Sequence, residues 1–113
     1  MHELSITESL LEIAIRHGKN ANADQITDLY LVIGELSSIV DDSVQFYWDI
    51  IAKDTIAEKA TLHFRRVPAE FQCLSCSEKY NPGDGEFVCP KCSSVRVKII
   101  AGEEFLLESI DVE

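Results

Sequence analysis

Two Cys-x-x-Cys pairs constrain the fold of this chain more than any other feature of its sequence. Cys73 and Cys76 form the first pair, and Cys89 and Cys92 form the second. A gap of two residues lets a tight turn point both sulfurs at one ion, and two such turns complete the tetrahedron that zinc prefers. The spacing therefore predicts one metal site made by four cysteine thiolates.

The segment that carries the cysteines offers little else to fold around. Apolar residues are sparse from Phe71 to Cys92, and Pro82–Gly85 predicts a tight turn. Structural zinc contributes roughly 10–16 kcal/mol to the folding of such small segments, more than a few aromatic side chains can supply. We expect a zinc-ribbon-like module over residues 70–93 whose folding energy comes from the metal.

The predicted zinc site is closed. Four thiolates leave no open position for water or substrate, whereas a catalytic zinc keeps one. A redox dithiol and a rubredoxin-like iron site remain as alternatives to structural zinc. An enzyme is excluded by the sequence pattern, which shows no nucleophile paired with a base, no phosphate-binding glycine loop and no open metal site.

Length and charge exclude further classes of function. The chain has 113 residues, ten Lys or Arg against twenty Asp or Glu, and a formal net charge of −10. This length fits one compact domain with a small appendage. Nucleic acid and anionic lipid bind through clustered basic residues, so neither is an expected partner.

The sequence also indicates where the protein acts. No stretch approaches the about 20 apolar residues that a bilayer span needs, so no membrane association is expected. The opening Met1–Ser5 lacks the basic and apolar regions of a signal peptide. We expect a cytoplasmic protein, in which the cysteines stay reduced and are available to a metal.

The first of two predicted helices begins near the amino terminus. Ser5 and Glu8 have the spacing of a capping box, in which each side chain bonds a backbone N–H at the helix start. Gly18 offers the left-handed residue that ends many helices. The pattern predicts a helix from Ser5 to His17.

A second helix and three strands follow from the same kind of pattern. Asp41 and Asp42 are candidate N-caps for a helix that should end near 51–54. Alternating apolar residues predict strands over 26–33, 60–67 and 105–112, and Val95 to Ile99 also alternates.

Together these elements predict an α+β fold. We expect a small sheet of about three strands with two helices on one face, plus the inserted zinc-ribbon-like module. Residues 1–69 and 94–113 would form the α+β domain, and residues 70–93 the zinc-binding module.

The amino terminus is a second candidate metal site. The amine of Met1, the backbone nitrogen of His2 and its Nδ1 lie in consecutive chelate rings, and the amide nitrogen of Glu3 can supply a fourth planar donor. Square-planar nitrogen donors suit nickel(II) or copper(II). The alternative is an exposed histidine at a frayed terminus, which leaves a metal carrier and a protein-binding zinc-ribbon adaptor as competing functions.

Three motifs in order resemble the HypA/HybF family of hydrogenase nickel incorporation proteins. They are Met1–Ser5, Ile33–Ser37 and the two Cys-x-x-Cys pairs, and the likeness covers nearly the whole chain. The resemblance implies a nickel metallochaperone that binds nickel at its amino terminus and delivers it for insertion into [NiFe]-hydrogenase. It implies as partners a hydrogenase maturation GTPase, the hydrogenase large subunit or its assembly complex, and urease maturation proteins as a further candidate.

The resemblance also assigns residues by position. Met1, His2 and Glu3 would bind nickel, and Cys73, Cys76, Cys89 and Cys92 would bind structural zinc. An acidic residue at the start of the second helix is a further candidate nickel ligand, with the choice between Asp41 and Asp42 open.

Overall fold

The computed structural model describes residues 2–82 and 87–113. Its elements are α1 (His2–Asn20), β1 (Ile26–Gly34), α2 (Asp41–Ile51), β2 (Thr61–Val67), β3 (Glu70–Cys73), β4 (Lys79–Tyr80), β5 (Val97–Ala101) and β6 (Phe105–Val112). The chain divides into two compact units, the first made of Met1–Val32, Ser38–Arg65 and Leu106–Glu113, the second of Ile33–Ser37 and Arg66–Phe105. The predicted α+β class is confirmed.

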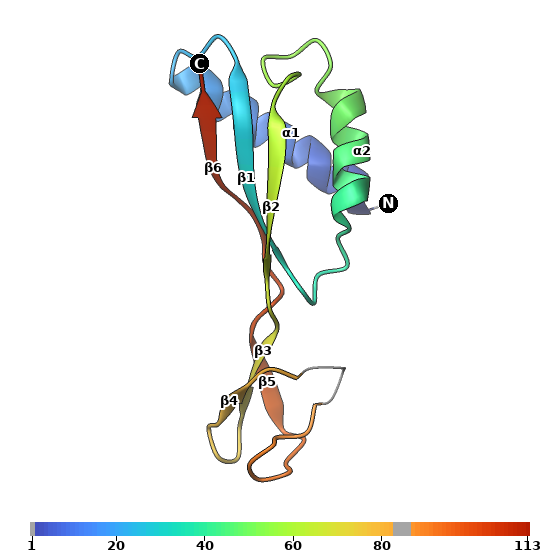
Figure 1. Cartoon of the computed structure of the whole chain (residues 1–113), viewed down its shortest axis with the longest axis vertical. Coiled ribbons are helices and arrows are strands. Elements are labelled where there is room, and N and C mark those ends of the chain that lie inside the picture. The colour runs from blue at the N-terminus through green and yellow to red at the C-terminus, as the bar shows by residue number, and fades with distance from the viewer. Residues whose placement is uncertain (1, 83–86) are drawn as a thin grey trace. The chain divides into compact units, whose positions relative to one another are not determined.

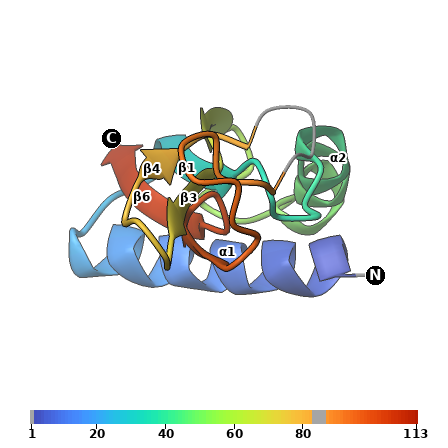
Figure 2. The ribbon, with the colours of Figure 1, turned by 90° about the horizontal axis from the view of Figure 1, so that it is seen from below.

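The first unit is a sheet covered by both helices. Its strands lie in the order β2-β1-β6 (Figure 1), and α1 crosses one face of the sheet (Figure 2). The buried side chains include Leu10 and Ala14 of α1, Leu29 and Leu31 of β1, and Val44 and Trp48 of α2. Each amphipathic helix therefore buries its apolar stripe against the sheet or the other helix.

The start of α1 differs from the prediction. The helix begins at His2, so Ser5 lies inside it and the capping box prediction is wrong. The buried Thr7 hydroxyl donates a hydrogen bond to the carbonyl oxygen of Glu3. A buried hydroxyl needs a partner, and helical backbone at Glu3 places that carbonyl within its reach.

The end of α1 also lies beyond the predicted His17. The helix continues to Asn20, and Asn22 takes the left-handed conformation, with φ 56°. Gly18 has a different role. A Cβ there would lie 3.1 Å from side-chain atoms of Ile26 and Ile56, so the absence of a side chain lets α1 pack closely on them.

The second helix begins where the sequence indicates but is not capped as predicted. The N-cap residue is Val40, which makes no side-chain cap hydrogen bond. The N–H groups of Ser43 and Val44 donate to its carbonyl oxygen, both at 3.1 Å. Asp41 and Asp42 therefore lie in the first turn, where negative charge is favourable at the positive end of the helix dipole.

The predicted strands are confirmed to within a residue for β1, β2 and β6. The sequence did not predict the second sheet, in the order β4-β3-β5, in which β3 pairs antiparallel with both neighbours. Of the predicted turn at Pro82–Gly85, residues 83–85 lie outside the described residues. Within the described part of the chain, no helix has the length and apolar character needed to cross a bilayer.

The compact unit that carries the cysteines consists of Ile33–Ser37 and Arg66–Phe105. The consecutive N–H groups of Gly34, Glu35 and Leu36 donate to the carbonyl oxygens of Glu104, Val67 and Gly102 at 2.7, 2.8 and 2.7 Å, respectively. This short segment thus joins the two stretches of chain that lead into and out of the cysteine region.

Candidate metal centre

The four cysteine sulfurs form one cluster. The Sγ atoms of Cys73 and Cys92 are 3.5 Å apart, those of Cys76 and Cys89 are 3.6 Å apart, and all four lie within 4.8 Å of one another. A disulfide bond would need about 2.05 Å, so these are separate thiols. The fold brings both pairs to a single point, as their spacing predicts.

The two Cys-x-x-Cys turns have the same backbone geometry. The Ser77 N–H donates to the Cys73 carbonyl oxygen at 3.0 Å, and the Ser93 N–H donates to that of Cys89 at 2.9 Å. Both serines take the left-handed conformation, with φ 65° and 63°. The repeated turn makes each pair a matching half of the site.

Backbone N–H groups also point at the sulfurs. Cys73 Sγ accepts from the Ser75 N–H at 3.3 Å, and Cys89 Sγ accepts from the Lys91 N–H at 3.4 Å. Donors aimed at sulfur favour the thiolate, which is the form that binds metal. Each turn therefore holds its first cysteine ready for coordination.

The four thiols nevertheless lie so close together that ionisation of one opposes ionisation of the others. A hydrogen bond from the Cys76 N–H lowers the pKa of Cys73 to about 6. The Ser94 N–H also favours the thiolate of Cys92, but the neighbouring Cys73 thiol, partial desolvation of the sulfur and the other two cysteines outweigh it and raise the pKa of Cys92 to about 12. Four thiolates this close need a cation among them.

The donor set fits a tetrahedral ion. Bonds of about 2.3 Å from zinc to sulfur place the sulfurs of a regular tetrahedron about 3.8 Å apart, close to the separations described above. Cys73 and Cys89 are buried, and Cys92 is exposed. The arrangement is that of a four-thiolate metal site rather than a single redox pair.

A small aromatic cluster supports the site. Phe71 is buried, its ring stacks on Phe87 with centroids 5.4 Å apart, and it meets Tyr80 edge-on at 5.9 Å. The Tyr80 hydroxyl donates to the Phe87 carbonyl oxygen at 2.8 Å. These few aromatic residues form one small core around Phe71 of β3.

The residues predicted to bind nickel lie in the first unit. His2 is the first residue of α1, Glu3 lies in its first turn, and Met1 is outside the described residues. Figures 1 and 2 both place this first turn beside the start of α2, where Asp41 is half-buried and Asp42 exposed.

Glu35, within the Ile33–Ser37 motif, has a structural role. Its Oε1 accepts a hydrogen bond from the N–H of Ala69 at 2.6 Å, and Ala69 is only 1% exposed. The carboxylate satisfies a buried donor and helps to anchor the chain just before β3. The signal in the sequence was the Ile33–Ser37 motif itself.

His63 lies on the outer face of the first sheet, as its strand pattern indicates. Its Nε2 is 2.8 Å from Asp28 Oδ1, and its ring stacks on Tyr30 with centroids 4.6 Å apart. Hydrogen bonds from His63 and then Thr27 lower the pKa of the Asp28 carboxyl. This exposed pair belongs to the sheet and not to the metal centre.

Comparisons with known proteins agree with this architecture. Residues 1–112 match the family profile described as hydrogenase/urease nickel incorporation, metallochaperone, hypA. A hydrogenase maturation factor HypA of Dehalococcoides mccartyi is 46% identical over 113 residues, which cover 100% of this chain and 95% of that protein. The corresponding protein of Caldanaerobacter subterraneus is 40% identical over 114 residues, with both chains fully covered.

Two solved structures share the fold. The solution structure of the Ni metallochaperone HypA from Helicobacter pylori aligns with a TM-score of 0.70 and 27% identity, covering 97% of this chain and 96% of that chain. A second solution structure of a HypA protein aligns with a TM-score of 0.78 and 28% identity, covering 100% and 97%.

Proposed function

We propose, from the premise that this chain belongs to the HypA family of hydrogenase/urease nickel incorporation metallochaperones, that it carries nickel(II) on its amino terminus and delivers it to [NiFe]-hydrogenase. The family match over residues 1–112 is the observation that carries this proposal. In this proposal the protein acts as a carrier and not as a catalyst, because it binds nickel and releases it unchanged.

The position of α1 supports a nickel site built on backbone nitrogen. The helix begins at His2, so the proposed nickel donors His2 and Glu3 lie in its first turn. The Met1 amine, the amides of His2 and Glu3 and the His2 imidazole would supply four nitrogen donors, and a square-planar set of nitrogens suits nickel(II).

Charge around this terminus supports cation binding as well. The start of α2 lies beside the first turn of α1 and carries Asp41 and Asp42. A carboxylate from either residue is a candidate for an additional nickel ligand or for a partner that attracts the incoming ion. The chain's formal net charge of −10 favours the same attraction over longer range.

The metal of the four-cysteine cluster is proposed to be zinc. Zinc commonly occupies closed sites of four thiolates, holds them in a tetrahedron and has no redox chemistry of its own. Cys73, Cys76, Cys89 and Cys92 would hold it, and its role is to fold the second unit. Reduced thiols of this kind fit a cytoplasmic location.

Delivery is proposed to occur by protein contact. The relatives are named hydrogenase maturation factors, and we expect this chain to work with a hydrogenase maturation GTPase and with the hydrogenase large subunit or its assembly complex. Urease maturation proteins are a further candidate, since the family description includes urease.

Calorimetric nickel titration of the zinc-loaded, untagged chain tests the proposal. Three variants are compared with it: His2→Ala, a chain with one residue added before Met1, and the control His17→Ala, which removes another histidine of α1. We expect the first two to lose nickel binding because they remove the imidazole or move the amine out of its chelate ring. The control should bind like the native chain.

Proton release gives a second readout of the same site. The amine has an ordinary pKa of about 7.7–8.0 and histidine of about 6.5, so nickel must displace protons near neutral pH. Titrations in buffers of different ionisation enthalpy should show that release, and binding should weaken from pH 8 towards 6. Equal affinity and equal proton release in the extended chain would show that the amine is not a ligand.

A further inference from the structure

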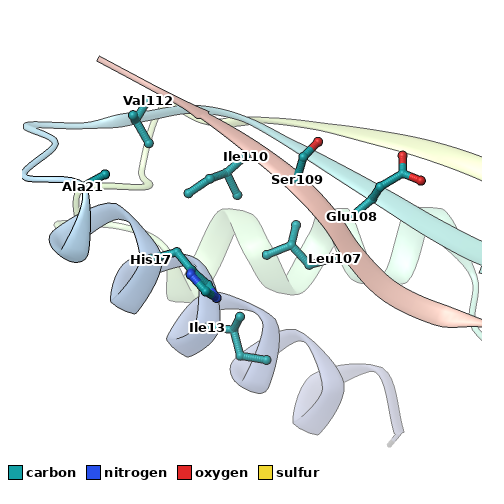
Figure 3. Close-up of a pocket in the computed structure, with 8 residues that line it drawn as sticks. All are labelled: Ile13, His17, Ala21, Leu107, Glu108, Ser109, Ile110 and Val112. Atoms are coloured by element: carbon teal, nitrogen blue, oxygen red, sulfur yellow. The ribbon is translucent and has the colours of Figure 1, made fainter.

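A groove lies between α1 and the edge strand β6. Its volume is about 320 Å³, and its walls are mainly Ile13, His17 and Ala21 from α1 and Leu107, Ile110 and Val112 from β6. Figure 3 shows the side chains of Leu107 and Ile110 pointing towards α1, whereas the Glu108 carboxylate points away from it. The groove is therefore mainly apolar on the side that faces α1, and Glu108 and Ser109 of β6 complete its lining.

The strand beside this groove has an open backbone edge. In the first sheet β6 is a terminal strand, with β1 as its neighbour in the described part of the chain. Gln25 and Glu113 exchange both backbone hydrogen bonds, at 3.2 and 2.9 Å. In an antiparallel pair the next residue turns its N–H and C=O the other way, so those of Val112 face outward.

An open edge beside an apolar groove is a combination that accepts an added strand. The edge supplies backbone donors and acceptors, and the groove takes every second side chain of the incoming segment. Ile13 and Val112 are 36% and 40% exposed, so apolar surface is available to be covered.

We propose that an extended segment of a partner protein binds here as a fourth strand next to β6, with apolar residues facing the groove and basic residues facing outward. The charge of β6 carries the second half of the proposal, because Glu108 and Asp111 are its charged residues. Glu108 accepts from Arg65 and Asp111 accepts from the Tyr30 hydroxyl, but a carboxylate can accept several hydrogen bonds.

The opposite edge of the sheet has the opposite charge. Strand β2 carries Arg65 and Arg66 and no acidic residue, so it would not select a basic segment. A second copy of this chain fits the β6 edge poorly, because pairing two β6 strands brings acidic side chains together, and like charges across a ladder are destabilising. The favoured occupant is therefore a different, basic chain.

The test uses a short fluorescent peptide in which valine alternates with lysine, added to the zinc-loaded chain without nickel. We expect saturable binding by fluorescence anisotropy, weakened by salt, and chemical-shift changes confined to β6 and the facing side of α1. A peptide with glutamate in place of lysine and one with N-methylated backbone amides should both bind at least about tenfold more weakly. Equal binding of the lysine and glutamate peptides would overturn the proposal.

Two variants locate the site. Ile13→Lys places a charge at the apolar wall, and its matched control is Ile50→Lys, on an α2 side chain that is 58% exposed outside the groove. Val112→Pro removes an N–H that faces outward and should leave the ladder with β1 intact. We expect Ile13→Lys and Val112→Pro to weaken peptide binding about tenfold or more while circular dichroism stays native.

Two further outcomes count against the proposal. If Ile50→Lys weakens binding as much as Ile13→Lys, the peptide binds elsewhere. If sedimentation shows that the free chain dimerises through β6, a second copy is the occupant. None of these readouts involves nickel, so a failure of this proposal can be distinguished from a failure of the proposed carrier function.

Discussion

A Cβ atom on Gly34 would lie 2.1 Å from the carbonyl oxygen of Gly102, so these two glycines meet backbone against backbone. Gly102 itself has φ 113°, a conformation that other residues rarely adopt, and a Cβ there would lie 2.7 Å from Cα of Ala69. The contact leaves no room for a side chain at either position. This contact lies where the Ile33–Ser37 segment packs against the rest of the second unit.

We therefore expect Gly34→Ala to destabilise the second unit strongly. The added methyl group meets backbone atoms that cannot rotate away, and overpacking of this kind costs about 1–3 kcal/mol or more. Urea unfolding followed by zinc release from the zinc-loaded chain measures the loss. Gly18→Ala is the control, because its Cβ would meet only side-chain atoms at 3.1 Å and Ala favours a helix. A similar midpoint for both variants would contradict this account.

Glu35 provides a test of a buried hydrogen bond. Glu35→Ala leaves the Ala69 N–H without its acceptor, which should cost about 1–3 kcal/mol of unfolding free energy. Glu35→Gln keeps a carbonyl oxygen at the same place and should lose much less. Chemical denaturation of the two variants in parallel measures this difference in stability. Neither change should alter the nickel titration, and this result would separate a structural carboxylate from a metal ligand.

We expect the proposed zinc of the cysteine cluster to determine the fold of the second unit. Cys76→Ala should lose zinc and unfold that unit, while the helices of the first unit keep their circular dichroism signal. Ser75→Ala is the matched control, because Ser75 lies between Cys73 and Cys76 and its hydroxyl makes a hydrogen bond with Ser94 Oγ, at 3.0 Å, away from the sulfurs. X-ray absorption should show a zinc shell of sulfur alone, and an iron spectrum or nitrogen donors would refute the assignment.

The pair of Asp28 and His63 predicts a pH dependence at the acidic end. Hydrogen bonds from His63 and Thr27 lower the pKa of Asp28 below its ordinary 3.8. The folded value is the lower one, so the stabilisation is complete above about pH 4 and is lost as the pH falls through the folded pKa.

His63→Phe keeps a ring stacked on Tyr30 but removes the donor. NMR titration of the Asp28 carboxyl should then give a pKa closer to 3.8. Thr27→Val removes the smaller contribution and should shift it less. An unchanged pKa in His63→Phe would show that the hydrogen bond contributes nothing in solution.

Local patterns in the sequence predicted much of the fold. The alternation of apolar residues located β1, β2 and β6, because one face of each strand is buried and register follows burial. The cysteine spacing predicted the four-sulfur cluster for a similar reason, since two short turns and one ion allow few arrangements.

The features that the sequence did not predict depend on distant contacts. The sequence predicted a helix start at Ser5. The buried Thr7 hydroxyl instead binds the carbonyl oxygen of Glu3, one helical turn earlier, so the helix begins before Ser5. The sheet around β3 forms from short strands with weak patterns, one of only two residues. The role of Glu35 required knowledge of where Ala69 lies in space. The nickel ligand set stays a prediction, because it rests on the resemblance and on donor chemistry.

The second unit is assembled from two stretches of chain that leave the ribosome at different times. Ile33–Ser37 is synthesised before Arg66–Phe105. The carbonyl oxygens of Val67, Gly102 and Glu104, which accept hydrogen bonds from its N–H groups, are added later. All four cysteines of the proposed zinc site are present once Cys92 has emerged, but the segment around Glu104 follows later. The proposed zinc site can thus be complete before the unit is, and a fragment cut at residues 70–93 would lack the Ile33–Ser37 segment.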